Sequence, residues 1–258
     1  MPIRWRRLAA TLTLLGLFVV LLAACGGSQA PAAPAASATP SASLGTPSTA
    51  SPSAAVSPSD DPDAGAALDA FKAFVQTQQS FHVQGDVRLQ VGSQTLHMDI
   101  QNDIGDGDEH ANLSITSGGA GIRMEIILLD GKGYAKIARR DWEEIPFEVG
   151  STNPLAALAI DGLEPAGRAN VAGQIAHVFR TDDPGVIQTS AIVGPTVTEL
   201  SLDTASFVVY VTDDGVPLIA TMNLAGSGTF EGATESVEAE VRYDFSRFGE
   251  PVVIEAPI

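Results

Sequence analysis

Apolar and polar residues alternate over much of this chain, and the alternation predicts β-strands. From Phe81 to Val91, the odd-numbered positions are mostly apolar and the even-numbered positions are polar. Successive side chains of a strand point to opposite faces of the sheet, so this segment has one dry face and one wet face. Similar patterns predict further strands around Leu96–Ile100, Ala111–Ile115, Ile122–Leu129, Tyr134–Arg139, Trp142–Val149, Gly162–Asn170, Gln174–Thr181, Ala205–Thr212, Val216–Leu224 and Glu235–Phe245.

Helical patterns are few. The segment 64–79 has an apolar stripe at helical spacing and predicts an amphipathic helix, which Asp63 could cap. The apolar segment 153–160 favours a short helix with Pro154 in its first turn. The segment 184–202 has no clear period, and we expect a short helix and a loop there.

Dipeptides that permit tight turns separate the predicted strands. Examples are Gly92-Ser93, Asp130-Gly131 and Asp214-Gly215. Short connections imply antiparallel neighbours, so we expect an α+β fold built on one large sheet of about nine or ten strands. A sheet of this width with little helix is expected to curl into a half-barrel whose concave apolar face is covered by helices.

The first 25 residues have the pattern of a bacterial lipoprotein signal. Three arginines precede an apolar run from Leu8 to Leu22, and the sequence then reads Leu22-Ala23-Ala24-Cys25. The apolar run is short for a membrane-spanning helix, which needs about 20 residues. We therefore expect residues 1–24 to be a signal peptide and Cys25 to carry acyl chains such as palmitate. These chains would anchor the protein to the cell membrane on its extracytoplasmic face. The alternative is an uncleaved signal anchor.

Residues 25–62 are predicted to be the lipidated cysteine and a flexible tether. Nearly every residue from Gly26 to Ser59 is Ala, Pro, Ser, Thr or Gly, a composition that cannot bury enough apolar surface to fold. Residues 63–258 form the predicted folded domain, and Cys25 is the only cysteine. Without the three leader arginines, 11 basic residues face 31 acidic ones, a formal charge of −20. This charge argues against a nucleic-acid partner.

The sequence contains no convincing catalytic, metal-binding or cofactor-binding motif, so we expect no enzyme, no metal site and no cofactor. His82, His97, His110 and His177 fall on separate predicted strands without metal-ligand spacing. The acidic stretch 103–109 lacks the spacing of an EF-hand and is expected to be a solvated hairpin loop. The stretch 226–228, Gly-Ser-Gly, is expected to be a flexible turn.

Several local motifs resemble the LppX/LprAFG lipoproteins and, more distantly, the LolA/LolB lipoprotein carriers. The segment 130–134, DGKGY, with Trp142 shortly after, is similar to a hairpin of that family. The segments 209–217, VYVTDDGVP, and 243–252, YDFSRFGEPV, resemble its strand-turn-strand segment and its C-terminal close. The resemblance covers about residues 64–258 and implies a half-barrel with an apolar cavity for acyl chains, and no catalytic residues.

These observations lead to the hypothesis of a lipid-binding or lipid-carrier lipoprotein of the cell envelope, with a lipid or an acylated molecule as its ligand. The alternative is a non-catalytic structural or protein-interaction module with a filled core and an envelope protein as its partner. A hydrolase is a third and more distant hypothesis. The residues expected to line the cavity are Leu96, Met98, Leu113, Ile115, Met124, Ile126, Leu128, Leu155, Leu158, Phe207, Val209, Met222 and Leu224.

Overall fold

The computed structural model describes residues 53–56, 61–77, 80–146, 154–157, 162–186, 197–230 and 232–257. They belong to one folded unit, Pro52–Ile258. The predicted signal peptide, Cys25, most of the predicted tether and the predicted lining residue Leu158 lie outside the described residues.

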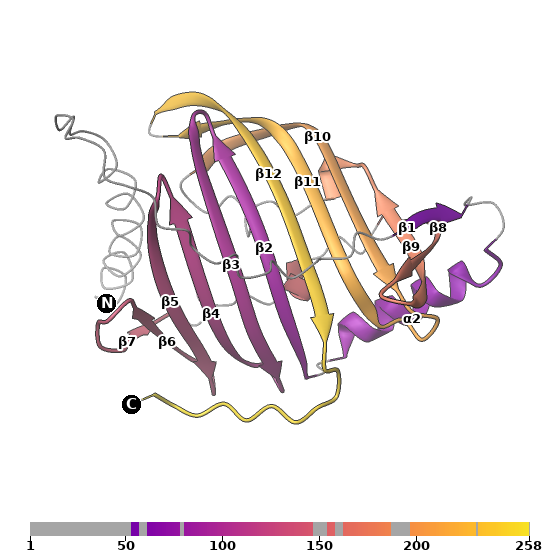
Figure 1. The fold of residues 1–258 in the computed structure, drawn as a ribbon, viewed down its shortest axis with the longest axis horizontal. Helices are drawn as coiled ribbons and strands as arrows, with labels where there is room; N and C mark the ends of the chain where they lie inside the picture. The colour runs from indigo at the N-terminus through magenta and orange to yellow at the C-terminus, as the bar shows by residue number, and fades with distance from the viewer. Residues whose placement is uncertain are drawn as a thin grey trace, which may run out of the picture. The chain divides into compact units, whose positions relative to one another are not determined.

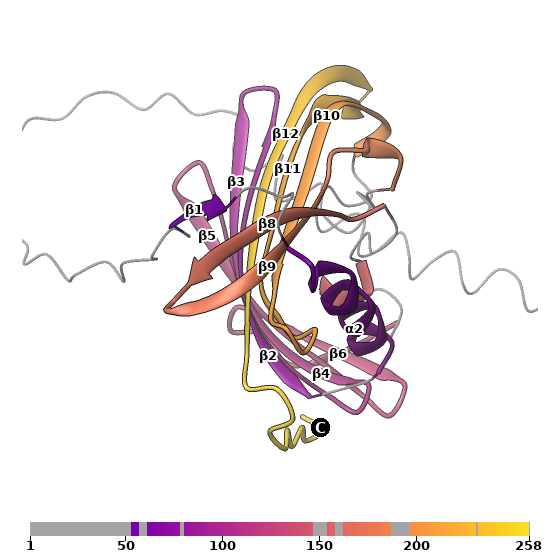
Figure 2. The ribbon, with the colours of Figure 1, turned by 90° about the vertical axis from the view of Figure 1, so that its right-hand side faces the viewer.

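The unit is built on one antiparallel sheet of 12 strands, in the order β1-β8-β9-β10-β11-β12-β2-β3-β4-β5-β6-β7. The sheet is open, with β1 at one edge and β7 at the other, and its strands curve and twist (Figures 1 and 2). The prediction of one large antiparallel sheet is confirmed. The strands are β1 (Ser53–Val56), β2 (Phe81–Val91), β3 (Gln94–Gly105), β4 (Asp108–Ser117), β5 (Ala120–Leu129), β6 (Lys132–Ile137), β7 (Glu143–Ile145), β8 (Glu164–Val171), β9 (Gln174–Thr181), β10 (Val197–Val211), β11 (Pro217–Phe230) and β12 (Ala233–Ser246).

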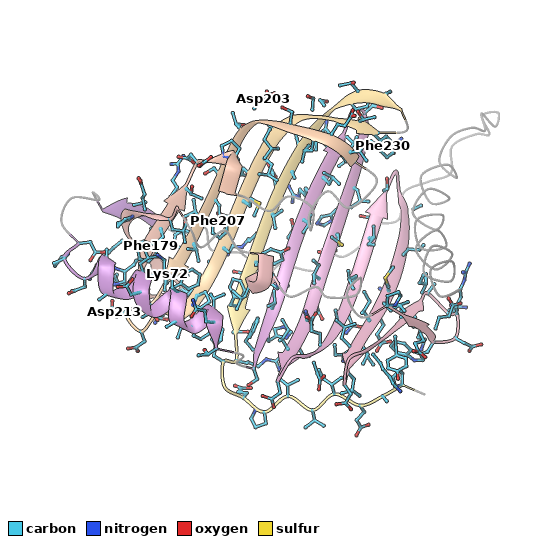
Figure 3. All side chains as sticks on the ribbon, turned by 180° about the vertical axis from the view of Figure 1, so that it is seen from behind. Lys72, Phe179, Asp203, Phe207, Asp213 and Phe230 are labelled. Atoms are coloured by element: carbon cyan, nitrogen blue, oxygen red, sulfur yellow. The ribbon has the colours of Figure 1, made fainter. Side chains whose placement is uncertain are left out.

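Helix α2 (Ala64–Gln76) packs its apolar stripe against one face of the sheet. Its Phe71 and Phe74 belong to a buried cluster with residues of β2, β3 and β9 to β12. Phe74 also makes an edge-to-face contact with Phe248, just after β12, at 5.3 Å between ring centroids. Figure 3 shows α2 in front of the strands when the sheet is seen from behind. The expected cap is wrong, because the Asp63 side chain makes no capping hydrogen bond.

The cluster that contains α2 occupies only part of this face of the sheet. The cluster that contains α2 also includes Leu155 of η2 (Pro154–Ala157), a short 3-10 helix. A second buried cluster lies on β4 and β5 and consists of Ala111, Leu113, Ile126 and Leu128. In the described residues, the cluster that contains α2 therefore extends over the β9–β3 part of the sheet, and the β4–β5 part has its own small core.

Two strands are longer than predicted. The expected helix and loop over 184–202 is wrong in part: a 3-10 turn, η3, covers Pro184–Val186, and β10 begins at Val197. The Gly-Ser-Gly stretch 226–228 is also not a turn, because it lies inside β11 and pairs with both neighbouring strands. A Cβ on Gly226 would collide with the backbone oxygen of Ser201, so glycine is needed for close approach where the β10–β11 register shifts.

Other predicted boundaries also shift. The strand expected over 142–149 is limited to β7 in the described residues, with 147–150 outside them. The folded sheet begins before residue 63, because β1 lies in the segment expected to be tether and pairs with β8. Residue Ser53 lies opposite Asn170, and Val56 lies opposite Arg168.

Candidate functional site

Five of the predicted lining residues belong to the buried cluster that contains helix α2. Phe207 and Val209 of β10 are 1% and 0% exposed, and Met222 and Leu224 of the neighbouring β11 are also buried. All four, together with Leu155, belong to the same cluster as Phe71 of the helix. Their position is that of a packed protein core.

Seven further predicted residues lie on the same face of the sheet, on β3 to β5. Leu113, Ile126 and Leu128 are buried in the second cluster, and the half-buried Met98 and Met124 pack against it. The half-buried Leu96 and Ile115 belong to neither of these two clusters.

The strand register places half-buried apolar side chains in adjacent rows on this face. Met98 of β3 lies opposite Ile115 of β4, which lies opposite Ile122 of β5. Met124 lies opposite Ile137 of β6 in the next row. We call these five residues, all half-buried, the β3–β6 apolar patch. A continuous apolar surface across four strands is the kind of surface that takes flexible hydrocarbon chains.

The apolar face also carries one phenol that keeps its proton. The ring of Tyr243 on β12 lies over Gly85 of β2, where an added Cβ would stand 2.9 Å from the ring. Burial raises the pKa of Tyr243 to about 12. This side chain is therefore neutral at physiological pH and adds no charge to the face.

Two surface depressions in the described residues have mixed or polar linings. One, of about 420 Å³, lies by β9 to β11 and includes Asp203 of β10, which Figure 3 labels. The other, of about 600 Å³, touches Leu113 and Met124, but its remaining lining is mostly polar or charged and includes Arg123, Glu125 and Lys136. Neither depression has the apolar lining expected for an acyl-chain cavity.

Three of the four histidines contact carboxylates on the polar face of the sheet. His82 Nδ1 lies 2.9 Å from Asp103 Oδ1, and His110 Nε2 lies 2.9 Å from Glu125 Oε1. His97 Nε2 lies 2.7 Å from Asp86 Oδ2. The polar-face prediction for His82 and His97 agrees with these contacts.

His177 is different, because its side chain is 1% exposed and lies between two carboxylates. Its Nδ1 is 2.6 Å from Asp61 Oδ2, and its Nε2 is 2.8 Å from Asp213 Oδ1. Figure 3 shows Asp213 near the end of the sheet that α2 crosses.

Asp61 also accepts a hydrogen bond of 2.8 Å from Arg168 Nη2. Burial acts to raise the pKa of Asp61, but the hydrogen bonds from Arg168 and His177 outweigh it, and the pKa is lowered from its ordinary 3.8. The sequence did not reveal this cluster, because Asp61 and His177 are 116 positions apart and Asp61 falls in the predicted tether.

Solved structures with a similar fold include LprF from Mycobacterium bovis, at 14% identity and a TM-score of 0.46, over 78% of this chain and 99% of that chain. A LolA superfamily protein from Nitrosomonas europaea is similar at 9% identity and a TM-score of 0.29, over 74% of this chain and 94% of that chain. A DUF1329 family protein from Desulfovibrio piger is similar at 13% identity and a TM-score of 0.28, over 78% of this chain and 96% of that chain. No family model and no curated protein matches the sequence.

LprF and the LolA superfamily protein come from the groups that the sequence motifs resemble. At these identities and TM-scores, the likeness concerns the fold and carries neither a ligand nor a site residue over to this chain. Among the helices that the structure describes, none has both the length and the apolar character needed to cross a membrane.

Proposed function

We propose that this protein is a membrane-anchored extracytoplasmic lipoprotein that binds acyl chains of a lipid or an acylated molecule on the β3–β6 apolar patch. The observation that carries the proposal is the difference between the two parts of one sheet face. In the cluster that contains α2, the apolar side chains are packed as a core. Across β3 to β6, the five side chains of the patch remain half-buried beside the smaller core of Leu113, Ile126 and Leu128.

The affinity would come from removing hydrocarbon from water. Each buried methylene contributes about 0.8 kcal/mol, so a chain of ten methylenes offers roughly 8 kcal/mol before the cost of ordering it. The two methionines of the patch suit this role, because their unbranched side chains adapt to different chain positions. No covalent step is part of the proposal, and the protein is proposed to act without catalysis.

The test is native mass spectrometry of residues 25–258 with Cys25→Ser, which contains the whole folded unit and avoids detergent. We expect a stoichiometric lipid adduct that organic extraction removes and identifies. The variant Met124→Asp places a carboxylate in the patch and is expected to abolish the adduct. Gln101→Asp adds the same charge at an exposed position on the opposite face of β3 and is expected to leave loading unchanged.

A folded Met124→Asp protein that still loads lipid would show that the patch is not the binding surface. A protein that is free of lipid and takes up no added fluorescent fatty acid would favour the second candidate, a module with a filled core that binds an envelope protein. The observation that favours this second candidate is the complete burial of Phe207 and Val209 under α2.

The anchor belongs to the same proposal and rests on the sequence around Cys25. Cells grown with an alkyne-labelled palmitate analogue are expected to label the wild-type chain and not Cys25→Ser. The wild-type chain should sediment with membranes and the variant should not. Equal sedimentation of both would support the uncleaved signal anchor instead.

A further inference from the structure

Two carboxylates face each other across strands β2 and β3 on the polar side of the sheet. Asp86 and Asp99 are direct register partners in this antiparallel pair. Like charges directly opposite each other destabilise a sheet unless a cation lies between or beside them. The pair therefore needs positive charge close to both carboxylates.

The imidazole of His97 lies beside the same two carboxylates. His97 lies two residues before Asp99, so its side chain is on the same face of β3. Its Nε2 is 2.7 Å from Asp86 Oδ2 and 3.8 Å from Asp99 Oδ1. One ligand atom from each of the three residues lies within 4.8 Å of the others.

This spacing is close to that of a metal site. Imidazole nitrogens and carboxylate oxygens bind Zn²⁺ at about 2.0–2.2 Å, so tetrahedral ligand atoms stand roughly 3.4 Å apart. The side chains of His97, Asp86 and Asp99 are 35%, 42% and 58% exposed, so small rotations can close the remaining gap. The exposure also leaves the fourth position open to water.

We infer that Asp86, His97 and Asp99 form a binding site for a divalent transition metal ion, with Zn²⁺ as the expected ion. Nitrogen and oxygen ligands together suit Zn²⁺ better than Ca²⁺ or Mg²⁺, which take oxygen ligands. The site lies on the opposite face from the β3–β6 apolar patch and does not depend on lipid binding.

Two arginines lie beside this site. Arg242 of β12 is the register partner of Asp86, but its guanidinium donates two hydrogen bonds to Asp244. Arg88 is the more weakly held competitor. Its Nε lies 3.6 Å from Asp86 Oδ1, and its Nη1 lies 4.0 Å from Glu240 Oε2. The side chain is 63% exposed, and an exposed ion pair at these distances is weak. A metal ion with three ligands is therefore expected to displace it.

The other histidines supply matched controls. His110 pairs with the single carboxylate of Glu125, on the same face of the sheet. His177 is buried, and both of its ring nitrogens already contact carboxylates. Neither is part of a three-ligand group in the described residues.

The test is a titration of the full chain, purified in dodecyl maltoside, with ZnCl₂ at pH 7. Calorimetry measures stoichiometry and affinity, and histidine ring NMR signals report which imidazole binds. We expect one ion per chain, with the His97 signal moving and the His177 signal unchanged.

His97→Gln and Asp99→Asn should each weaken binding at least tenfold, and His110→Gln should not change it. Arg88→Gln, which removes the competing cation, should strengthen binding.

Equal Zn²⁺ affinity in His97→Gln and wild type would overturn the inference. So would simultaneous shifts of the His82, His97 and His110 signals, because they would mean diffuse attraction to an acidic surface. Circular dichroism of each variant shows that a lost signal does not come from unfolding.

Discussion

The cluster around the buried His177 joins parts of the chain that are far apart in sequence. Asp61 precedes α2, Arg168 and His177 lie on β8 and β9, and Asp213 lies in the β10–β11 turn. Removing one partner of a buried ion pair leaves an uncompensated charge, which costs about 3–5 kcal/mol. This cluster therefore fixes the point where the N-terminal segment enters the sheet.

The first prediction concerns Asp61→Asn and pH. The folded pKa of Asp61 is lowered, so the ionised carboxylate stabilises the fold above its ordinary pKa, and this stabilisation is lost as pH falls through the folded value. At pH 7 we expect the free energy of unfolding of the variant to be about 3 kcal/mol lower than that of wild type. The difference between the two proteins should shrink as pH falls below about 4.

Urea unfolding of both proteins between pH 7 and pH 3 measures this difference. Asp182→Asn is a suitable control, because the Asp182 carboxylate is also paired, with Arg180, but its side chain is 54% exposed. Its effect is expected to be much smaller, because an exposed ion pair contributes little to stability. A constant gap between wild type and Asp61→Asn at all pH values would contradict the assigned role of the carboxylate.

At the scale of the elements, the long strands β10 and β11 depend on one close approach. Gly226 permits it, because any Cβ there would collide with the backbone of Ser201 and stand 2.9 Å from the Cα of Leu202. The backbone cannot move aside as a flexible side chain would. The two strands must therefore separate locally if this glycine is replaced.

We predict that Gly226→Ala lowers the free energy of unfolding by about 1–3 kcal/mol, the usual range for overpacking. Gly65→Ala is the matched control. Gly65 is in helix α2 and has no atom within 4 Å of an added Cβ. This substitution should stabilise the protein by about 0.5–1 kcal/mol, since glycine loses more backbone entropy in a helix. Thermal unfolding of both variants measures the two effects, and a shift of the same sign in both would refute the close-approach argument.

Strand periodicity predicted the elements well wherever one face is dry and the other wet. The segment from Phe81 to Val91 is the clear example, because its predicted bounds are those of β2. The pattern failed in β11, where Gly226 and Gly228 signal a turn but serve close packing. It failed again at β1, because this short edge strand, of sequence SAAV, has too little apolar alternation to detect.

The candidate site was predictable only in part for a related reason. Alternation correctly assigns Met98, Met124 and Phe207 to one face of the sheet, but it cannot tell which part of that face α2 covers. Likewise, the group of Asp86, His97 and Asp99 depends on the register of β2 against β3, which sequence spacing alone does not give.

At the scale of the whole molecule, the open sheet has two short edges. β7 has three residues and β1 has four, and short edge strands limit pairing with other chains. β1 pairs with β8, the strand that carries Arg168. The segment before residue 63 thus contributes both an edge strand and the Asp61 carboxylate to the folded unit.

The last prediction follows from this arrangement and compares chains that begin at Pro52 and at Asp63. The longer chain keeps β1 and Asp61, and the shorter one loses the β1–β8 pairing and leaves Arg168 and His177 without the Asp61 carboxylate. We expect the free energy of unfolding of the shorter chain to be lower by at least about 3 kcal/mol, because one buried ion pair is broken. Adding Asp61→Asn should weaken the longer chain by most of that amount. Urea unfolding at pH 7 measures all three proteins, and equal stability of the two truncations would place the start of the folded unit at residue 63, as the sequence composition predicts.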